Sequence, residues 1–195
     1  MEHLNINQLP KKFNEILLES KKLDFDMPSE INVNALLRML AAIKPNGRCL
    51  ELGTGTGLAS SWIIDGLNIS GHLTTVDNEQ KWLAVARKYL GDDPRITIVH
   101  SDGNDFLISE TEKSSRYDLI FADTWAGKYQ SLDLALGLLA PGGVYVIDDM
   151  LPQKNWPEGH AIKVRNLIKD LKFRNSLKIC SLIWSCGVII ATKHD

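Results

Sequence analysis

A glycine-rich turn between an apolar strand and an apolar helix constrains this chain more than any other feature. The segment 48–52 is predicted to be a strand, residues 51–57 read E-L-G-T-G-T-G, and a helix is predicted to begin at Leu58. Glycine adopts backbone conformations that are closed to other residues, and it lets a ligand lie against bare main chain. Strand, glycine turn and helix in this order form the first unit of a nucleotide-binding α/β sheet.

The spacing of the glycines separates two classes of ligand. A dinucleotide-binding loop reads G-x-G-x-x-G, but Leu58 occupies the place of the third glycine and Glu51 precedes the turn. The order E-x-G-x-G-x-G resembles the first motif of the class I methyltransferases, which bind S-adenosylmethionine (SAM). This resemblance implies that SAM lies against Glu51, Gly53, Thr54, Gly55 and Gly57. Pairing of Glu51 with Arg48 or with a helix terminus is the alternative.

The remaining segments alternate between strand and helix patterns. Strands are predicted at 72–77, 96–100, 117–122 and 144–148, and helices at 79–90, 104–109, 128–139 and 158–171. Two apolar runs, 177–184 and 188–192, read as an antiparallel hairpin. This order predicts an α/β fold of three layers, with a Rossmann-like sheet of seven strands whose last strand is antiparallel, as in the class I methyltransferases.

Two helical patterns precede the first strand, with Ser29 as the predicted N-cap of the second. They divide one domain, 1–195, into a helical cap over 1–45 and a core over 46–195. The neighbouring segment Met27-Pro28-Ser29 is similar to the segment that closes over SAM in the cation-dependent O-methyltransferases.

Composition limits the partners. The formal net charge is −2, from 22 basic and 24 acidic residues, so no overall basic field attracts nucleic acid. The apolar runs are too short to span a bilayer, and residues 1–5 lack the pattern of a secretory signal. The three cysteines have no metal-finger spacing and are expected to be buried, reduced thiols of a cytoplasmic protein. The expected partner is a small-molecule acceptor, with a homodimer left open.

Two acidic residues follow predicted strands where a cofactor would lie. Asp77, with Asn78, ends the second strand, where a carboxylate can bind ribose hydroxyls or cap the next helix. Asp102, with Gly103, follows the third strand; the resemblance to the class I methyltransferases implies that it holds the adenine amine, and a turn is the alternative. Acidic surroundings repel the phosphates of a dinucleotide and favour the positive sulfonium of SAM.

Three further carboxylates follow the fourth and fifth strands. Asp123, Asp148 and Asp149 are expected to converge beside the cofactor, because neighbouring parallel strands end at one edge of the sheet. Converging carboxylates repel unless they are protonated or bound to a cation, and Mg²⁺ or another divalent ion fits oxygen ligands. A helix cap for Asp123 and a strand-end turn for the pair are the structural alternatives.

These positions resemble the cation-dependent O-methyltransferases typified by catechol and caffeoyl-coenzyme A O-methyltransferase. Asp123, Trp125 and Tyr129 stand in the register of that family, whose fifth strand ends in Asp-Asn where this chain has Asp-Asp. The resemblance implies a SAM-dependent O-methyltransferase for a small aromatic hydroxyl compound, with Asp123 as a catalytic residue that contacts both the cofactor and the metal.

One departure concerns the catalytic base. Ala126 replaces the lysine of the catechol enzyme, and Lys128 is a nearby substitute unless it is simply a solvated residue at a helix start. His160 is a second candidate base, and Trp156 could stack on the acceptor; a helix-start histidine and a rigid connector are the alternatives. Other functions left open are a metal-independent N- or protein methyltransferase, a non-catalytic SAM-binding protein and a NAD-dependent oxidoreductase.

Overall fold

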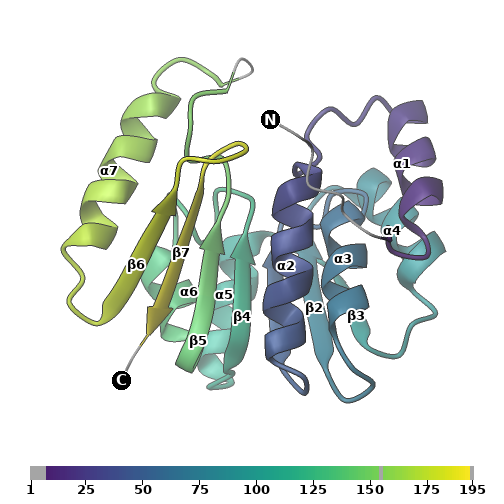
Figure 1. Ribbon diagram of the computed structural model, residues 1–195, viewed down its shortest axis with the longest axis horizontal. Helices are drawn as coiled ribbons and strands as arrows, with labels where there is room; N and C mark the ends of the chain where they lie inside the picture. The colour runs from purple at the N-terminus through teal and green to yellow at the C-terminus, as the bar shows by residue number, and fades with distance from the viewer. Residues whose placement is uncertain (1–7, 154–155, 194–195) are drawn as a thin grey trace.

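A single mixed sheet of seven strands organises the chain. The computed structural model describes residues 8–153 and 156–193. The strands are β1 (Arg48–Leu52), β2 (His72–Asp77), β3 (Ile96–His100), β4 (Tyr117–Ala122), β5 (Leu139–Ile147), β6 (Leu177–Leu182) and β7 (Val188–Lys193), in the spatial order β3-β2-β1-β4-β5-β7-β6. Strands β1 to β5 pair in parallel, and β7 runs antiparallel to both β5 and β6 (Figure 1). The predicted α/β fold is confirmed.

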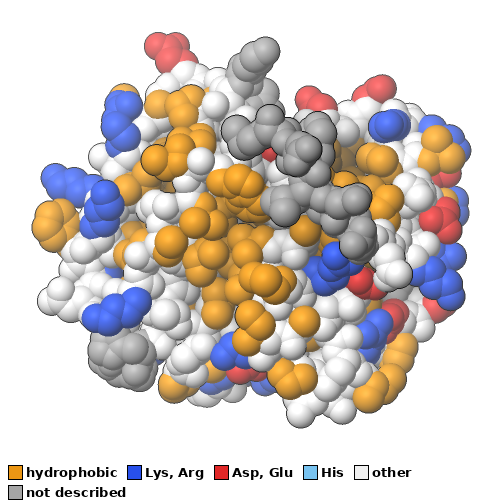
Figure 2. All heavy atoms as spheres, in the orientation of Figure 1, with side chains coloured by type: hydrophobic (Ala, Val, Ile, Leu, Met, Phe, Trp, Pro, Cys, Tyr) orange, Lys and Arg blue, Asp and Glu red, His pale blue; other side chains and the backbone are white. Residues whose placement is uncertain are grey.

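Helices cover both faces of this sheet. One face packs against α1 (Phe13–Lys22), α2 (Ile31–Ile43), α3 (Leu58–Gly66) and α4 (Gln80–Leu90), and the other against α5 (Gly103–Glu112), α6 (Leu132–Gly137) and α7 (His160–Lys172). Side chains of a strand alternate between the faces, so Leu119 and Phe121 join the first core and Ile120 the second. Hydrophobic side chains gather at the centre of the face shown in Figure 2. This area lies beside α2, where the helices α1 to α4 no longer cover the sheet in the same view of Figure 1.

The region between β4 and β5 differs from its predicted form. The helix predicted at 128–139 is reduced to α6, because the amides of Lys128, Tyr129 and Gln130 all bond to the carbonyl of Trp125 in a tight turn. Ser131 then adopts a left-handed conformation with φ 52°, which starts the helix at the following residue. Strand β5 begins at Leu139, earlier than predicted, and this turn positions Lys128 against the sheet edge.

Two smaller expectations are wrong. Ser29 does not cap α2: the N-cap residue is Glu30, which has no capping side-chain bond, and the Ser29 hydroxyl instead donates to Asp123. Cys49 and Cys186 are buried free thiols as expected, but Cys180 is exposed.

None of the helices in the described ranges has the length and apolar character needed to cross a bilayer. The prediction about a secretory signal concerns residues 1–5, which lie outside the described residues.

Candidate active site

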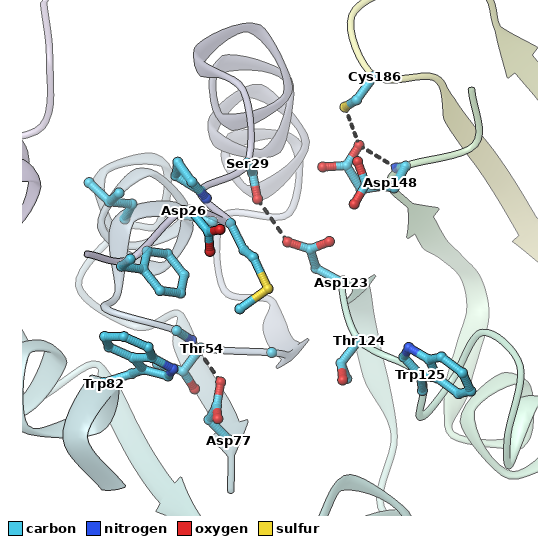
Figure 3. A pocket seen from close by; sticks show the side chains of 18 of the residues that line it. Asp26, Ser29, Thr54, Asp77, Trp82, Asp123, Thr124, Trp125, Asp148 and Cys186 are labelled. Carbon is cyan, nitrogen blue, oxygen red and sulfur yellow. Dashed lines mark hydrogen bonds between the residues drawn. The ribbon is translucent and has the colours of Figure 1, made fainter. Parts of the chain in front are cut away.

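A cavity of about 540 Å³ lies at the carboxyl edge of the sheet (Figure 3). Its walls come from the segment before α2, the glycine turn, the ends of β2, β4 and β5, the start of α7 and the turn between β6 and β7. A smaller lobe of about 240 Å³ adjoins it and shares Gly53, Asp77, Asn78, Thr124 and Trp125 with it. The volume of the larger cavity is typical of cavities that hold small ligands.

The glycine turn is shaped by conformations that side chains rarely adopt. Gly53, Gly55 and Gly57 have φ angles of 103°, 51° and 91°. A Cβ on Gly53 would lie 2.9 Å from the carbonyl oxygen of Asp123, and one on Gly55 would lie 2.7 Å from Cζ of Phe25. The turn therefore packs closely between the end of β4 and the segment before α2. Gly53, Thr54 and Gly55 line the cavity.

Asp77 supports this turn and also lines the cavity. Its Oδ2 accepts a bond of 2.8 Å from the amide of Gly55, and its Oδ1 accepts one of 2.9 Å from the amide of Glu79. Glu79, and not Asp77, is the N-cap residue of α4. Each carboxylate oxygen has a second lone pair, so Asp77 can accept further bonds from a ligand while it holds the turn.

Asp102 both caps helix α5 and borders the smaller lobe. It is the N-cap of α5, where its Oδ1 accepts bonds from the amides of Asn104 and Asp105 at 2.8 and 3.3 Å. Asp102 and Gly103 both line the smaller lobe. The capping role is therefore present, and the side chain still borders the space where a ligand could lie.

Glu51 requires a correction, because it does not line the cavity. It is fully buried, and its Oε2 accepts hydrogen bonds from the hydroxyls of Ser60 and Thr75, the latter at 2.5 Å. Burial raises the pKa of Glu51 to about 8, so the carboxyl group is largely protonated at neutral pH. Glu51 joins β1, β2 and α3 behind the glycine turn and adds little negative charge to the cavity.

Asp123 directly follows β4 and lies on the cavity wall (Figure 3). Its Oδ2 accepts a bond of 2.9 Å from the Ser29 hydroxyl, and its Oδ1 lies 3.4 Å from Nζ of Lys128. Lys128 is only 5% exposed, so the alternative of a solvated lysine is wrong. Burial raises the pKa of Asp123, and the charge of Lys128 opposes that rise. Asp123 and Lys128 thus form an ion pair on the cavity wall, which the sequence did not predict.

The end of β5 brings a thiol into the predicted metal site. The amide of Asp149 and the thiol of Cys186 donate to Oδ1 of Asp148 at 2.8 and 2.6 Å. Burial and then the charge of Asp123 raise the pKa of Asp148 to about 7. Among the described residues, the group of candidate metal ligands whose donor atoms lie within 4.8 Å of one another is Asp148, Asp149 and Cys186.

The predicted trio of Asp123, Asp148 and Asp149 is corrected accordingly. Asp123 stands outside the group of donor atoms that lie within 4.8 Å of one another, and its two oxygens contact Ser29 and Lys128 instead. Cys186 was not predictable as its replacement, because it belongs to a turn that reaches Asp148 only through the pairing of β7 with β5. The one sequence signal for Cys186 was its place in the predicted hairpin turn, because a strand antiparallel to β5 begins where β5 ends.

A cluster of aromatic rings forms another part of the cavity wall. Nε2 of His160 lies 3.1 Å from the hydroxyl oxygen of Tyr129, and its ring centroid lies 4.6 Å from that of Trp156. Trp125 packs edge-on against Tyr129 and is 44% exposed. Burial, and next the charge of Lys128, lower the pKa of His160. His160 begins α7 and also lines the cavity, as a neutral ring that can accept a proton.

A family of known proteins shares this chain's sequence pattern. The family model described as O-methyltransferase matches residues 10–194. The chain belongs to the O-methyltransferase family. A Mycobacterium leprae protein that is provisionally named an O-methyltransferase is 32% identical over 95 residues. These residues are 47% of this chain and 42% of that protein. A Mycobacterium ulcerans relative is 34% identical over 121 residues, or 59% and 53%. The chain thus spans about half the length of the curated relatives it matches.

Solved structures share the fold. An O-methyltransferase from Bacillus cereus, determined with S-adenosylhomocysteine, superposes with a TM-score of 0.85 at 18% identity and covers 97% of this chain and 93% of its own. An O-methyltransferase from Streptomyces achromogenes involved in tomaymycin synthesis, determined with SAM, also has a TM-score of 0.85, at 21% identity over 98% and 93% of the two chains. The predicted family and fold are therefore confirmed.

Proposed function

We propose that this protein transfers the methyl group of SAM to a hydroxyl of a small aromatic acceptor, with the help of a divalent cation. The observation that carries the proposal is the single cavity that joins the glycine turn to an end lined by carboxylates and aromatic rings. A methyl donor at the turn and a planar acceptor at the aromatic wall would face each other across Asp123. The family membership of the chain supports the same reaction.

The glycine turn and the two lobes suit the parts of SAM. The bare backbone at Gly53 and Gly55 permits close approach, and Asp77 with Asn78 has acceptor capacity for ribose hydroxyls. Asp102 and Gly103 border the smaller lobe, where an adenine amine would find an acceptor. Asp123 offers a negative charge to the sulfonium, and SAM carries no phosphate that such a charge would repel.

The acceptor end supplies groups that can manage a proton. In an in-line displacement the carbon–sulfur bond of SAM breaks, a carbon–oxygen bond forms, and the hydroxyl proton leaves to a base. His160 is our candidate for that base, because its neutral ring lines the cavity. The ammonium of Lys128, held beside Asp123, favours a deprotonated oxygen. Trp125 and Trp156 provide planar surfaces for a ring.

Asp148 and Asp149 suit a divalent cation. Both line the cavity, and no ion pair within the described residues includes either of them. A buried carboxylate without an ionic partner is costly, and an ion bound to oxygen ligands would relieve that cost. A bound cation would supply charge that orients an acceptor hydroxyl and lowers its pKa.

Methyl transfer can be measured directly. The purified protein would be incubated with methyl-tritiated SAM and a panel of catechols, flavonoids and simple phenols, with added Mg²⁺ or with EDTA. Labelled product that declines in EDTA supports the proposal, whereas undiminished transfer in EDTA supports a metal-independent methyltransferase. Calorimetric titration should detect S-adenosylhomocysteine. Tight binding of NADH without any binding of S-adenosylhomocysteine would reject the proposal in favour of an oxidoreductase.

A pair of variants tests the assigned cofactor site. Asp77→Ala removes the carboxylate that holds the amide of Gly55 and should weaken binding of S-adenosylhomocysteine at least tenfold. That factor corresponds to about 1.4 kcal/mol, the scale of one charge-assisted hydrogen bond. Asp92→Ala is the matched control, since Asp92 is exposed and lies outside both lobes. Equal affinities of the two variants would contradict the assignment of Asp77.

We also propose a cytoplasmic location, which the three unpaired cysteines favour.

A further inference from the structure

We propose that Cys186 is a protein ligand of the metal site, together with Asp148 and Asp149, and that the site therefore takes a borderline transition ion such as Zn²⁺ or Co²⁺ in preference to Mg²⁺. This inference rests on the proposed function only in placing a cation at the acceptor end of the cavity. It goes beyond that function by assigning a third ligand and the class of the ion.

The donor atoms already stand together. One carboxylate oxygen from each aspartate and Sγ of Cys186 lie within 4.8 Å of one another, and Sγ is 2.6 Å from Oδ1 of Asp148. The two aspartates directly follow β5, and the thiol comes from the turn between β6 and β7. Figure 3 shows Cys186 and Asp148 directed toward each other at the cavity wall. All three residues line that cavity.

The backbone fixes the thiol in this position. The amide of Leu151 donates to the carbonyl of Cys186 at 2.8 Å, and the amide of Met150 donates to that of Gly187 at 2.9 Å. Gly187 adopts φ 86°, and a Cβ there would lie 2.5 Å from the amide nitrogen of Leu151. The turn is therefore bound to the segment that follows β5. Ligands held in place before the ion arrives lose little conformational freedom on binding.

Asp148 also has an oxygen to offer. The side chain is 1% exposed, and both of its hydrogen bonds within the described residues go to Oδ1, so Oδ2 is left for a ligand. The nearby ammonium of Lys128 is paired with Asp123. Asp148 is thus a buried carboxylate on a cavity wall with one oxygen that accepts no hydrogen bond within the described residues, which favours a bound cation.

The mixed donor set selects the ion. Mg²⁺ takes oxygen ligands and keeps several waters, whereas Zn²⁺ and Co²⁺ accept thiolate together with carboxylate. When such an ion binds, a metal–sulfur bond replaces the S–H bond of Cys186 and the proton passes to the buffer. Two oxygens and one sulfur from the protein leave at least one position of a tetrahedral ion open.

Cobalt spectroscopy tests the sulfur ligand without measuring methyl transfer. The full chain, stripped with a chelator and dialysed, would be titrated with Co²⁺ and followed in the near ultraviolet, where thiolate-to-cobalt charge transfer absorbs. We expect one equivalent to produce this band in the wild type and in Cys180→Ser, and no band in Cys186→Ser. Cys180 is the matched control, because it is an exposed thiol in the same hairpin.

Calorimetry adds the choice of ion. Cys186→Ser should weaken Zn²⁺ binding by more than about 100-fold, beyond the usual effect of losing an outer-shell partner, and leave Mg²⁺ binding unchanged. If Cys186→Ser does not fold, Asp148→Asn serves as the second variant, and it should also lose affinity for Zn²⁺. Absence of the cobalt band in the wild type, an equal band in Cys186→Ser, or tighter binding of Mg²⁺ than of Zn²⁺ would each overturn the proposal.

The two proposals can fail separately. Binding of S-adenosylhomocysteine, measured on the same samples, reports on the methyl-donor site alone. A cobalt band without any such binding would retain the thiol-containing metal site and reject the proposed function. Binding of S-adenosylhomocysteine without a cobalt band would retain the proposed methyl-donor site and reject the thiol-containing metal site.

Discussion

The burial of Glu51 makes a quantitative prediction about stability and pH. Its carboxyl group is fully buried, and burial raises its pKa from 4.5 to about 8. The folded protein therefore holds a proton that the unfolded chain releases above about pH 4.5. For a raised pKa the stabilisation is complete below the unfolded value and is lost as the pH rises through the folded value. Glu51 should make the protein less stable at pH 7.5 than at pH 5.5.

The magnitude follows from these two values. At about 1.4 kcal/mol per pH unit, the full window from 4.5 to about 8 corresponds to about 5 kcal/mol as an upper bound. Between pH 5.5 and 7.5, which lie inside the window, the contribution of Glu51 should fall by about 2 to 3 kcal/mol. Glu51→Gln cannot titrate, so its free energy of unfolding should gain that amount relative to the wild type over the same interval.

Urea unfolding followed by tryptophan fluorescence at pH 5.5, 6.5 and 7.5 measures this difference. Other titrating groups cancel, because they are common to both proteins. Glu110→Gln is the matched control: burial raises the pKa of Glu110, but hydrogen bonds from Ser115, Tyr117 and Lys113 outweigh it and lower the pKa. Glu110 thus stays ionised throughout, and its variant should differ from the wild type by a constant amount. Parallel curves for Glu51→Gln and the wild type would refute a protonated Glu51.

Two further substitutions test the glycine turn and the segment that covers it. Gly57→Ala should lower the free energy of unfolding in urea by roughly 1–3 kcal/mol, because φ is 91° and the new Cβ would lie 3.0 Å from Cβ of Ala86. Gly137→Ala is the control, because nothing lies within 4 Å of the added Cβ there. An equal effect at both sites would contradict backbone strain at Gly57. Ser29→Ala removes the hydroxyl that donates to Asp123 and should cost about 1–2 kcal/mol in the same assay. Ser29→Thr retains a hydroxyl and should be less affected; no loss in Ser29→Ala would show that the bond does not hold the segment before α2 to the sheet.

Local pattern was sufficient for most of the fold. The glycine turn, the strand–helix alternation and the final hairpin each depend on neighbouring residues, because side-chain periodicity and backbone freedom act over a few positions. The placement of Asp77, Asp102, Asp123 and Asp148 at the cavity followed from one further rule, that parallel strands end at the same edge of the sheet. The turn at Ser131 escaped this reasoning, since a serine in a left-handed conformation has no local signature there.

The chemical state of the site was decided by contacts between distant segments. Ser29 reaches Asp123 across 94 positions, and Cys186 reaches Asp148 across 38. Glu51 stands beside the glycines in the sequence, yet the alternation of side chains along β1 directs it behind the turn and into the protein, where it meets Ser60 and Thr75. The sequence by itself determined that the aspartates which follow the parallel strands come to the sheet edge. Only the tertiary structure decided which of them are charged, paired or free to bind a ligand, because burial and distance set those properties.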